Sequence, residues 1–304
     1  MRFNPFYKGI IYTCIASIFW GMPQPLIFNE IKYVPPVEVA IHRGLWSFIL
    51  LSLILISLCK TKEFFLIFQS YKKLFILTLT ASLILINWTG FIFAVSIERV
   101  QDASMGYYIT PMINIVLGYL FLKENISIFK LLSLLMMLSA IIYLIINNDS
   151  FPYIAIIIGT TWGIYGLLRK QINVKPEIGL LYESGLITLL AGPYLIYLNY
   201  NNLGYFMNHS SVTTLLLILA GGVTVFPLFF FNLGLRYISL GFAGVLFYLA
   251  PSFHFITSIF ILNEPLSFVK LTAFVIIWIA VVIFIIDVIK KENTSIANNT
   301  QLLN

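Results

Sequence analysis

The sequence predicts an all-α integral membrane protein with ten transmembrane helices, arranged as two inverted five-helix repeats around a central cavity. Three observations predict this fold. The 304-residue chain is 60% hydrophobic and only 10% charged, whereas roughly a quarter of the residues of a soluble domain are charged. Its apolar stretches are about 20 residues long, which is the length of helix that crosses a bilayer core about 30 Å thick. The second half of the chain also repeats residues of the first half at a nearly fixed offset.

Short polar breaks divide the chain into these ten helices. The first apolar stretch is followed after a short break by another, without a small-residue cleavage site, so we expect a membrane span there rather than a signal peptide. Later breaks are rich in lysine, arginine and asparagine, most clearly at 60–63, 72–73, 147–150, 169–177 and 199–202. The expected spans are residues 9–29, 37–58, 74–96, 102–122, 127–147, 152–168, 178–199, 212–235, 240–262 and 268–289.

Lysine and arginine predict which side of the membrane each break faces, because they are enriched in cytoplasmic segments. With the N-terminus inside, fourteen of these residues fall in cytoplasmic segments and three fall outside, at Lys32, Arg99 and Lys270. Both termini are therefore expected to be cytoplasmic, and the formal charge of +6 does not call for a nucleic-acid partner. The polar segment 290–304 is expected to be a disordered cytoplasmic tail.

The repeat divides the chain into a first unit at 1–147 and a second unit at 148–289. Each unit has five spans, an odd number, so the second unit must lie inverted in the membrane. Inverted repeats are typical of secondary transporters, in which the substrate site lies near the midplane between the halves. An offset of 142 aligns Trp20-Gly21 with Trp162-Gly163. An offset of 140 aligns Ala103 with Ala243, Tyr108 with Tyr248, Pro111 with Pro251, Glu124 with Glu264, Ser127 with Ser267 and Lys130 with Lys270.

Several sequence segments also match one transporter family from about residue 8 to residue 289. They are FWG at 19–21, VPPVE at 34–38, HRGLWSF at 42–48, NW at 87–88, NIVLGYLFLKE at 114–124, YGLLRK at 165–170 and IWIA at 277–280. The chain thus resembles the drug/metabolite transporter superfamily, specifically its RarD-like branch of EamA-domain permeases. The resemblance implies an inner-membrane permease of a bacterium. It also implies a cavity lined mainly by the first, third, fourth, sixth, eighth and ninth helices.

Arg43 and Glu183 are the charges deepest in the expected spans, and they lie 140 residues apart. Charged residues inside a membrane are costly and are candidates for function. Because the repeats are inverted, Arg43 is expected near the outer face and Glu183 near the inner face, roughly 12 Å apart in depth. We therefore expect no direct salt bridge. One interpretation is functional: each residue helps to close or couple its own half of the pathway, and His42 acts together with Arg43. The other interpretation is structural, with the Arg43 side chain extending to the membrane interface.

Two prolines near the midplane, Pro111 and Pro251, are candidate hinges, because proline frees a backbone carbonyl and kinks a helix. A packing bend is the alternative.

Glu124 and Glu264 come where their spans end, followed by Ser127 and Ser267 as expected N-caps of the next helices, so tight hairpins explain them better than a role in transport.

Aromatic and amide side chains in the expected lining helices form the remaining candidate site. They suit an amphipathic organic substrate, including a cation held over ring faces, although some of them are also typical interfacial anchors. His254 is in addition a candidate proton-coupling group. The candidates are Trp20, Asn87, Trp88, Tyr108, Asn114, Trp162, Tyr248 and His254.

These features favour a gradient-driven transporter of small organic metabolites or drugs. The sequence has no glycine-rich phosphate loop and no paired metal-ligand motif such as HExxH, so we expect no cofactor, no metal and no enzyme activity. The alternatives are an intramembrane lipid-modifying enzyme or lipid flippase, and a scaffold. The expected partners are a small-molecule substrate and the lipid bilayer, with the chain a monomer or a homodimer.

Overall fold

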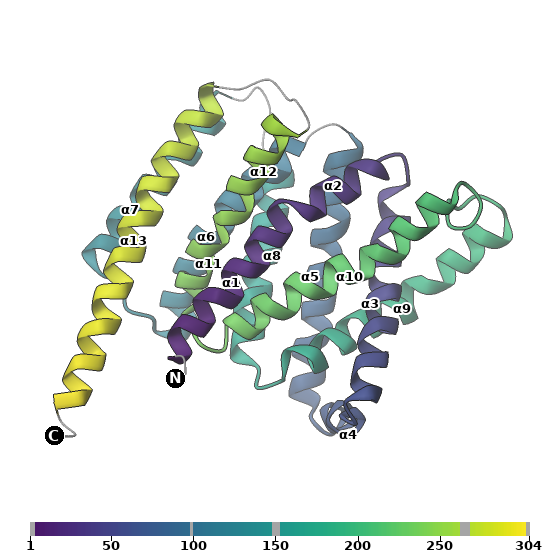
Figure 1. Ribbon diagram of the computed structural model, residues 1–304, viewed down its shortest axis with the longest axis horizontal. Helices are drawn as coiled ribbons and strands as arrows, with labels where there is room; N and C mark the ends of the chain where they lie inside the picture. The colour runs from purple at the N-terminus through teal and green to yellow at the C-terminus, as the bar shows by residue number, and fades with distance from the viewer. Residues whose placement is uncertain (1–3, 98–99, 148–152, 262–267, 302–304) are drawn as a thin grey trace.

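The computed structural model describes residues 4–97, 100–147, 153–261 and 268–301, and these residues form helices and short connections (Figure 1). The helices are α1 (Pro5–Gly21), α2 (Pro23–Glu30), α3 (Pro36–Ser57), α4 (Thr61–Phe65), η1 (Leu66–Gln69), α5 (Tyr71–Ser96), α6 (Val100–Leu122), α7 (Ile128–Ile146), α8 (Tyr153–Gln171), α9 (Pro176–Tyr200), α10 (Ser211–Gly234), α11 (Leu240–Phe247), α12 (Leu249–Phe260) and α13 (Phe268–Gln301).

Eight segments of the described chain are long and apolar enough to cross a membrane. They are Pro5–Glu30, Pro36–Ser57, Tyr71–Ala94, Ile128–Ile146, Pro176–Tyr200, Ser211–Gly234, Leu240–Thr257 and Leu271–Lys291. The two other expected spans, 102–122 and 152–168, coincide with the helices α6 and α8. The apolar stretch of α6, Gly106–Leu122, is shorter than the eight segments above. α8 is less apolar than they are, because it contains glycines, threonines and a terminal Arg169-Lys170 pair. The chain is therefore an all-helical, multi-pass membrane protein.

Two of the expected spans are each built from two helices. The first span breaks at Met22, where α1 ends and α2 starts with Pro23, which has no N–H to continue the helix. The ninth breaks at Tyr248, between α11 and α12. Pro251 has no N–H to bond the carbonyl of Phe247, the residue at which α11 ends. Its counterpart Pro111 lies inside the continuous helix α6, so the two candidate hinges differ in local structure.

The last helix is longer than the sequence analysis expected. α13 continues to Gln301, so residues 290–301 are helical where a disordered tail was expected. Extending an existing helix costs far less than starting one, because each added residue gains a hydrogen bond. Lys291 also pairs with Asp287 one turn earlier, at 3.0 Å, a spacing that stabilises helices.

Three pairs of helices whose residue ranges differ by about 140 pack against one another. α3 contacts α9, α7 contacts α13, and α6 contacts α11; α7 and α13 form one edge of the molecule in Figure 1. The other contacts come in matched sets as well: α6 packs on α8 as α11 and α12 pack on α1, and α1 packs on α10 as α8 packs on α5. The sequence offset is therefore also a relation between neighbours in space.

Close packing of α3 on α10 depends on Gly221. A Cβ placed at Gly221 would lie 2.4 Å from the Cβ of Trp46 and 2.6 Å from its backbone carbon, whereas a Cβ at Gly222 meets nothing within 4 Å. Small residues allow helix backbones to approach in this way within a membrane. The two adjacent glycines therefore form a matched pair for testing this helix contact.

Gly221→Ala is expected to lower the free energy of unfolding by about 1–3 kcal/mol, because the backbone of α3 must move to make room. Gly222→Ala should leave it unchanged within about 1 kcal/mol. Thermal unfolding of the two purified variants in detergent checks this. Equal midpoints for both would contradict the close approach of α3 and α10.

Candidate functional site

A buried pocket lies where α1, α2, α3, α5, α6, α8, α11 and α12 meet. Its walls are aromatic, from Trp20, Trp88, Phe91, Tyr107, Trp162 and Phe247, and its polar residues are Gln24, Arg43, Asn87 and His254. The free volume is about 20 Å³, room for about one water molecule. Five of these residues, Trp20, Asn87, Trp88, Trp162 and His254, are candidates from the aromatic and amide set, and Arg43 is a sixth candidate from the sequence.

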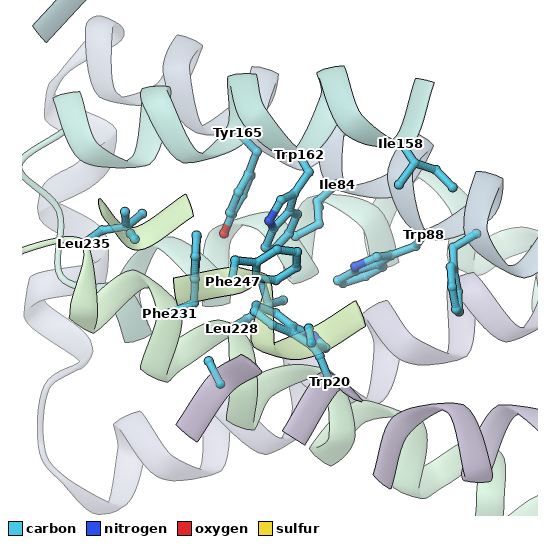
Figure 2. Close-up of a cluster of buried hydrophobic side chains, with 14 of the residues drawn as sticks. Trp20, Ile84, Trp88, Ile158, Trp162, Tyr165, Leu228, Phe231, Leu235 and Phe247 are labelled. Atoms are coloured by element: carbon cyan, nitrogen blue, oxygen red, sulfur yellow. The ribbon is translucent and has the colours of Figure 1, made fainter. Parts of the chain in front are cut away.

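The centre of the pocket is a contact between the two tryptophans that the repeat aligns. The rings of Trp20 and Trp162 meet edge to face, with centroids 5.1 Å apart and an angle of 90° between planes. Phe247 and Phe231 pack on both of them, as Figure 2 shows. The contact joins α1, which carries Trp20, to α8, which carries Trp162.

Arg43 is the charged residue among those that line the pocket, and it is 2% exposed. Its Nε donates to the Oγ1 of Thr224 at 2.9 Å. Its guanidinium carbon lies 4.4 Å from the ring centre of Trp88 and 4.9 Å from that of Phe28. In the described part of the chain no carboxylate lies within ion-pair distance of it. Arg43 does not extend to the interface but is held inside by ring faces and one hydroxyl group.

The other polar candidates near the pocket are used in different ways. The Nδ2 of Asn87 donates to the backbone oxygen of Ile158 at 2.9 Å, and so joins α5 to α8. The ring of His254 packs near those of Tyr107 and Phe91. His42 is not a pocket residue: its Nδ1 accepts from Trp46 at 3.2 Å, and its ring packs on Phe206.

Glu183 lies at the centre of a separate buried network. Its Oε1 accepts from the hydroxyl of Thr80 at 2.6 Å, and its Oε2 from that of Tyr165 at 3.3 Å. The Nη1 of Arg169 faces Oε1 at 3.5 Å, an ion pair between side chains 2% and 3% exposed. The Nε of Arg169 donates to Asn232 at 3.0 Å. Glu183 thus ties α9 to α5, α8 and α10, and it pairs with Arg169 rather than Arg43.

A smaller cavity of about 10 Å³ borders both charged sites. Its lining includes Trp88 and Thr224, which contact Arg43, and Glu183 itself. Arg43 and Glu183, which lie 140 residues apart in the sequence, are thus held by separate sets of buried partners.

Three further candidates lie away from the pocket. The hydroxyl of Tyr248 donates to the backbone oxygen of Tyr108 at 2.7 Å, and the two rings pack 6.0 Å apart. This contact joins α6 to the start of α12, and Phe274 of α13 covers it. Asn114 is 1% exposed and lies against Gly163 and Gly244, between α6, α8 and α11. These residues belong to the packing around the site.

Glu124 joins the two halves instead of closing a local hairpin. Its carboxylate oxygens accept from the backbone N–H groups of Leu240 at 2.6 Å and Gly241 at 3.2 Å, where α11 begins. Ser127 does cap α7, as the sequence predicted, by accepting from the N–H of Lys130 at 3.1 Å. Glu264 and Ser267 lie outside the described residues.

Sequence reasoning missed the partners of the two charges: Arg169, Thr80, Thr224 and Asn232. Arg169 was counted among the cytoplasmic charges, yet it is 7% exposed and belongs to the last turn of α8. Its spacing from Trp162 and Tyr165 is the signal that could have found it, because residues three, four and seven apart share one face of a helix.

No cluster of three His, Cys, Asp or Glu side chains able to hold a metal occurs in the described part of the chain.

Known proteins resemble this chain over nearly its whole length. The model of the EamA-like transporter family matches it twice, at residues 7–146 and 151–286. An uncharacterized transporter of Bacillus subtilis, YojE, is 33% identical, with 95% of this chain and 97% of that protein covered. Protein RarD of Escherichia coli is 32% identical, with 94% and 96% covered.

One solved protein structure shares the fold, with a TM-score of 0.69 at 13% identity, covering 91% of this chain and 96% of that one. The residues that carried the resemblance in the sequence therefore predicted the family correctly. The chain belongs to the EamA-like transporter family, and within it resembles the RarD proteins.

Proposed function

We propose that this protein is a secondary transporter that moves a small organic molecule across the cytoplasmic membrane by alternating access. The observation that carries the proposal is the pocket at the contact between Trp20 and Trp162, aligned residues of the two halves. A site at such a contact can be exposed to one side and then the other by a small rocking of the halves. The membership of a transporter family agrees with it.

The proposed architecture is ten spans in two inverted repeats, 1–147 and 148–289, with both termini in the cytoplasm. The packing of helices 140 residues apart supports the repeats. The start of α1 and the end of α13 point toward the same end of the molecule in Figure 1, as an even number of crossings requires. The excess of lysine and arginine in the breaks on that side supports the orientation.

In this orientation the Glu183 network lies toward the cytoplasm and the Arg43 pocket toward the outside. The network joins four helices, and Lys170 adds a bond to the carbonyl of Leu235 at 2.8 Å. We therefore interpret the conformation as closed toward the cytoplasm. A pocket of about 20 Å³ is too small for an organic molecule, so its aromatic walls must separate for the substrate to enter.

Uptake into proteoliposomes tests the transport function. Liposomes with the purified protein are incubated with a defined mixture of amino acids, nucleosides, sugars and organic acids, and their contents are measured by mass spectrometry. One class of solute should enter faster than into protein-free liposomes. Gln24→Trp, which fills the pocket, should abolish that difference, whereas Leu189→Trp at a position 72% exposed should preserve it.

Two results would contradict the proposal. Uptake no faster than in protein-free liposomes would remove its basis, and accelerated exchange of labelled lipid between leaflets without solute uptake would instead favour a flippase. Uptake that persists in Gln24→Trp would show that the pathway runs elsewhere. Membership of a transporter family favours transport over the alternative of a lipid-modifying enzyme.

A further inference from the structure

We infer that the pocket recognises an anionic group of its substrate, so that the substrate class is an organic anion with an aromatic or apolar body. The inference rests on the proposed function and deepens it. Two observations carry it: the charge of Arg43 lacks a counter-ion among the described residues, and the indole N–H of Trp162 in the pocket wall is a buried donor without a partner there.

The first observation concerns the guanidinium of Arg43. It has five N–H bonds in a planar fork, and Nε uses one of them on Thr224. The remaining donors belong to a side chain that is 2% exposed and lines the pocket. None of the residues that line the pocket is acidic. A buried charge is normally paired, and a carboxylate, phosphate or sulfonate on a ligand matches the fork of arginine in geometry as well as charge.

The second observation is independent and concerns Trp162. Its Nε1–H group can donate a hydrogen bond but cannot accept one. The atom is buried and has no hydrogen-bond partner among the described residues. Trp162 is 4% exposed and forms part of the pocket wall. A buried donor without a partner is costly unless a ligand or water completes it. Arg43 and Trp162 together present donors, and the oxygens of an anion are acceptors.

The same geometry argues against a cationic substrate. The ring faces of Trp88 and Phe28 are occupied by the guanidinium of Arg43, at 4.4 and 4.9 Å. One of the aromatic rings that the sequence suggested for a substrate cation, that of Trp88, therefore already holds a cation of the protein. A second positive charge in this pocket would meet Arg43 at short range and low dielectric, where repulsion is strong.

The rest of the substrate is set by the walls. Trp20, Phe91 and Phe247 surround the space beside Arg43 and offer rings and carbon atoms. Such walls bind apolar or aromatic groups. An inorganic anion would fill only the polar end, so the body of the substrate supplies contacts that a free phosphate lacks.

Ligand binding to the full-length protein in detergent tests the inference. The probes are phenylacetate, phenyl phosphate and benzenesulfonate, with phenylacetamide as the neutral match, phenethylamine as the cationic match and inorganic phosphate as the anion without a body. Tryptophan fluorescence is the readout, since three of the five tryptophans line the pocket, and the thermal midpoint is a second one.

At least one aromatic anion should bind, and the amide, the amine and inorganic phosphate should bind more weakly by about tenfold or more. Arg43→Gln should weaken binding of that anion by about 10- to 150-fold. Arg43→Lys should retain part of the affinity, because it keeps the charge but not the fork. Trp162→Phe, which removes one donor and keeps an aromatic ring, should weaken it by about 2- to 12-fold.

Three results would overturn the inference: equal binding of the anion and its amide, unchanged binding in Arg43→Gln, or no binding by any of the anions at 10 mM, roughly the weak limit for a specific ligand. If Arg43→Gln does not fold, Arg43→Lys and the comparison of matched probes on the natural protein still decide. Uptake of the solute mixture separates this inference from the transport function. A protein that moves only neutral or cationic solutes would refute the anion class and leave transport standing.

Discussion

Glu183→Gln is expected to lower the free energy of unfolding by about 3–5 kcal/mol, because it leaves the buried charge of Arg169 without its counter-charge. The side chains are 3% and 2% exposed and lie 3.5 Å apart, so water cannot replace the lost partner. The glutamine oxygen can still accept from Thr80, which isolates the loss of charge from the loss of a hydrogen bond. Thermal unfolding in detergent, compared with the natural protein, measures the effect.

The chain offers a matched control in the exposed pair of Glu63 and Lys175. Their atoms lie 2.6 Å apart, closer than those of the buried pair, but the side chains are 37% and 45% exposed. Glu63→Gln should therefore cost at most about 1 kcal/mol. The double variant of Glu183→Gln with Arg169→Gln should recover part of the loss, because neither charge is then stranded. A loss for Glu183→Gln as small as the control would mean that the carboxyl group is already neutral in the folded protein.

The helical membrane fold could be predicted from the sequence, because the lengths of the apolar stretches reflect the bilayer thickness. The repeat was also visible in the sequence, but the packing of aligned helices such as α3 and α9 on each other was not part of that prediction. Helix ends were less predictable: α8 continues past residue 168 to Gln171, and this extra turn is what buries Arg169. A count of charges between spans cannot distinguish a loop arginine from one that points back into the protein.

Which side chains face the pocket could be predicted only in part. In a soluble helix the polar face marks the solvent side, but a helix surrounded by lipid is apolar on every face. Trp20 and Trp162 were recognisable because the repeat aligned them. Tyr108 and Tyr248 were aligned equally well, yet they meet each other outside the pocket. Alignment identified pairs of residues that contact each other, but not which of these pairs lines the pocket.

Trp162→Ala is expected to lower the free energy of unfolding strongly, because it removes a side chain from the aromatic cluster around the pocket. Trp162 stacks on Tyr165 at 5.2 Å and contacts Trp20, Phe231 and Phe247. Removing a buried tryptophan side chain costs about 3–5 kcal/mol, because a cavity remains. Trp278→Ala is the control of the same residue type, since Trp278 is 36% exposed, and it should cost clearly less in the same thermal unfolding measurement.

The pair Trp20 and Trp162 allows a sharper test of the central contact. If the contact stabilises the conformation closed toward the cytoplasm, the losses in Trp20→Ala and Trp162→Ala should not add, and the two should couple by about 0.5–3 kcal/mol. Additive losses would show that each tryptophan acts through its own neighbours only. Three results together would place the substrate pathway at the contact between the two halves. The two losses of stability would couple, both single variants would lose uptake, and Trp278→Ala would transport normally. This outcome would join the packing of the fold to its function, because the residues that the repeat makes equivalent would also be those that must separate during transport.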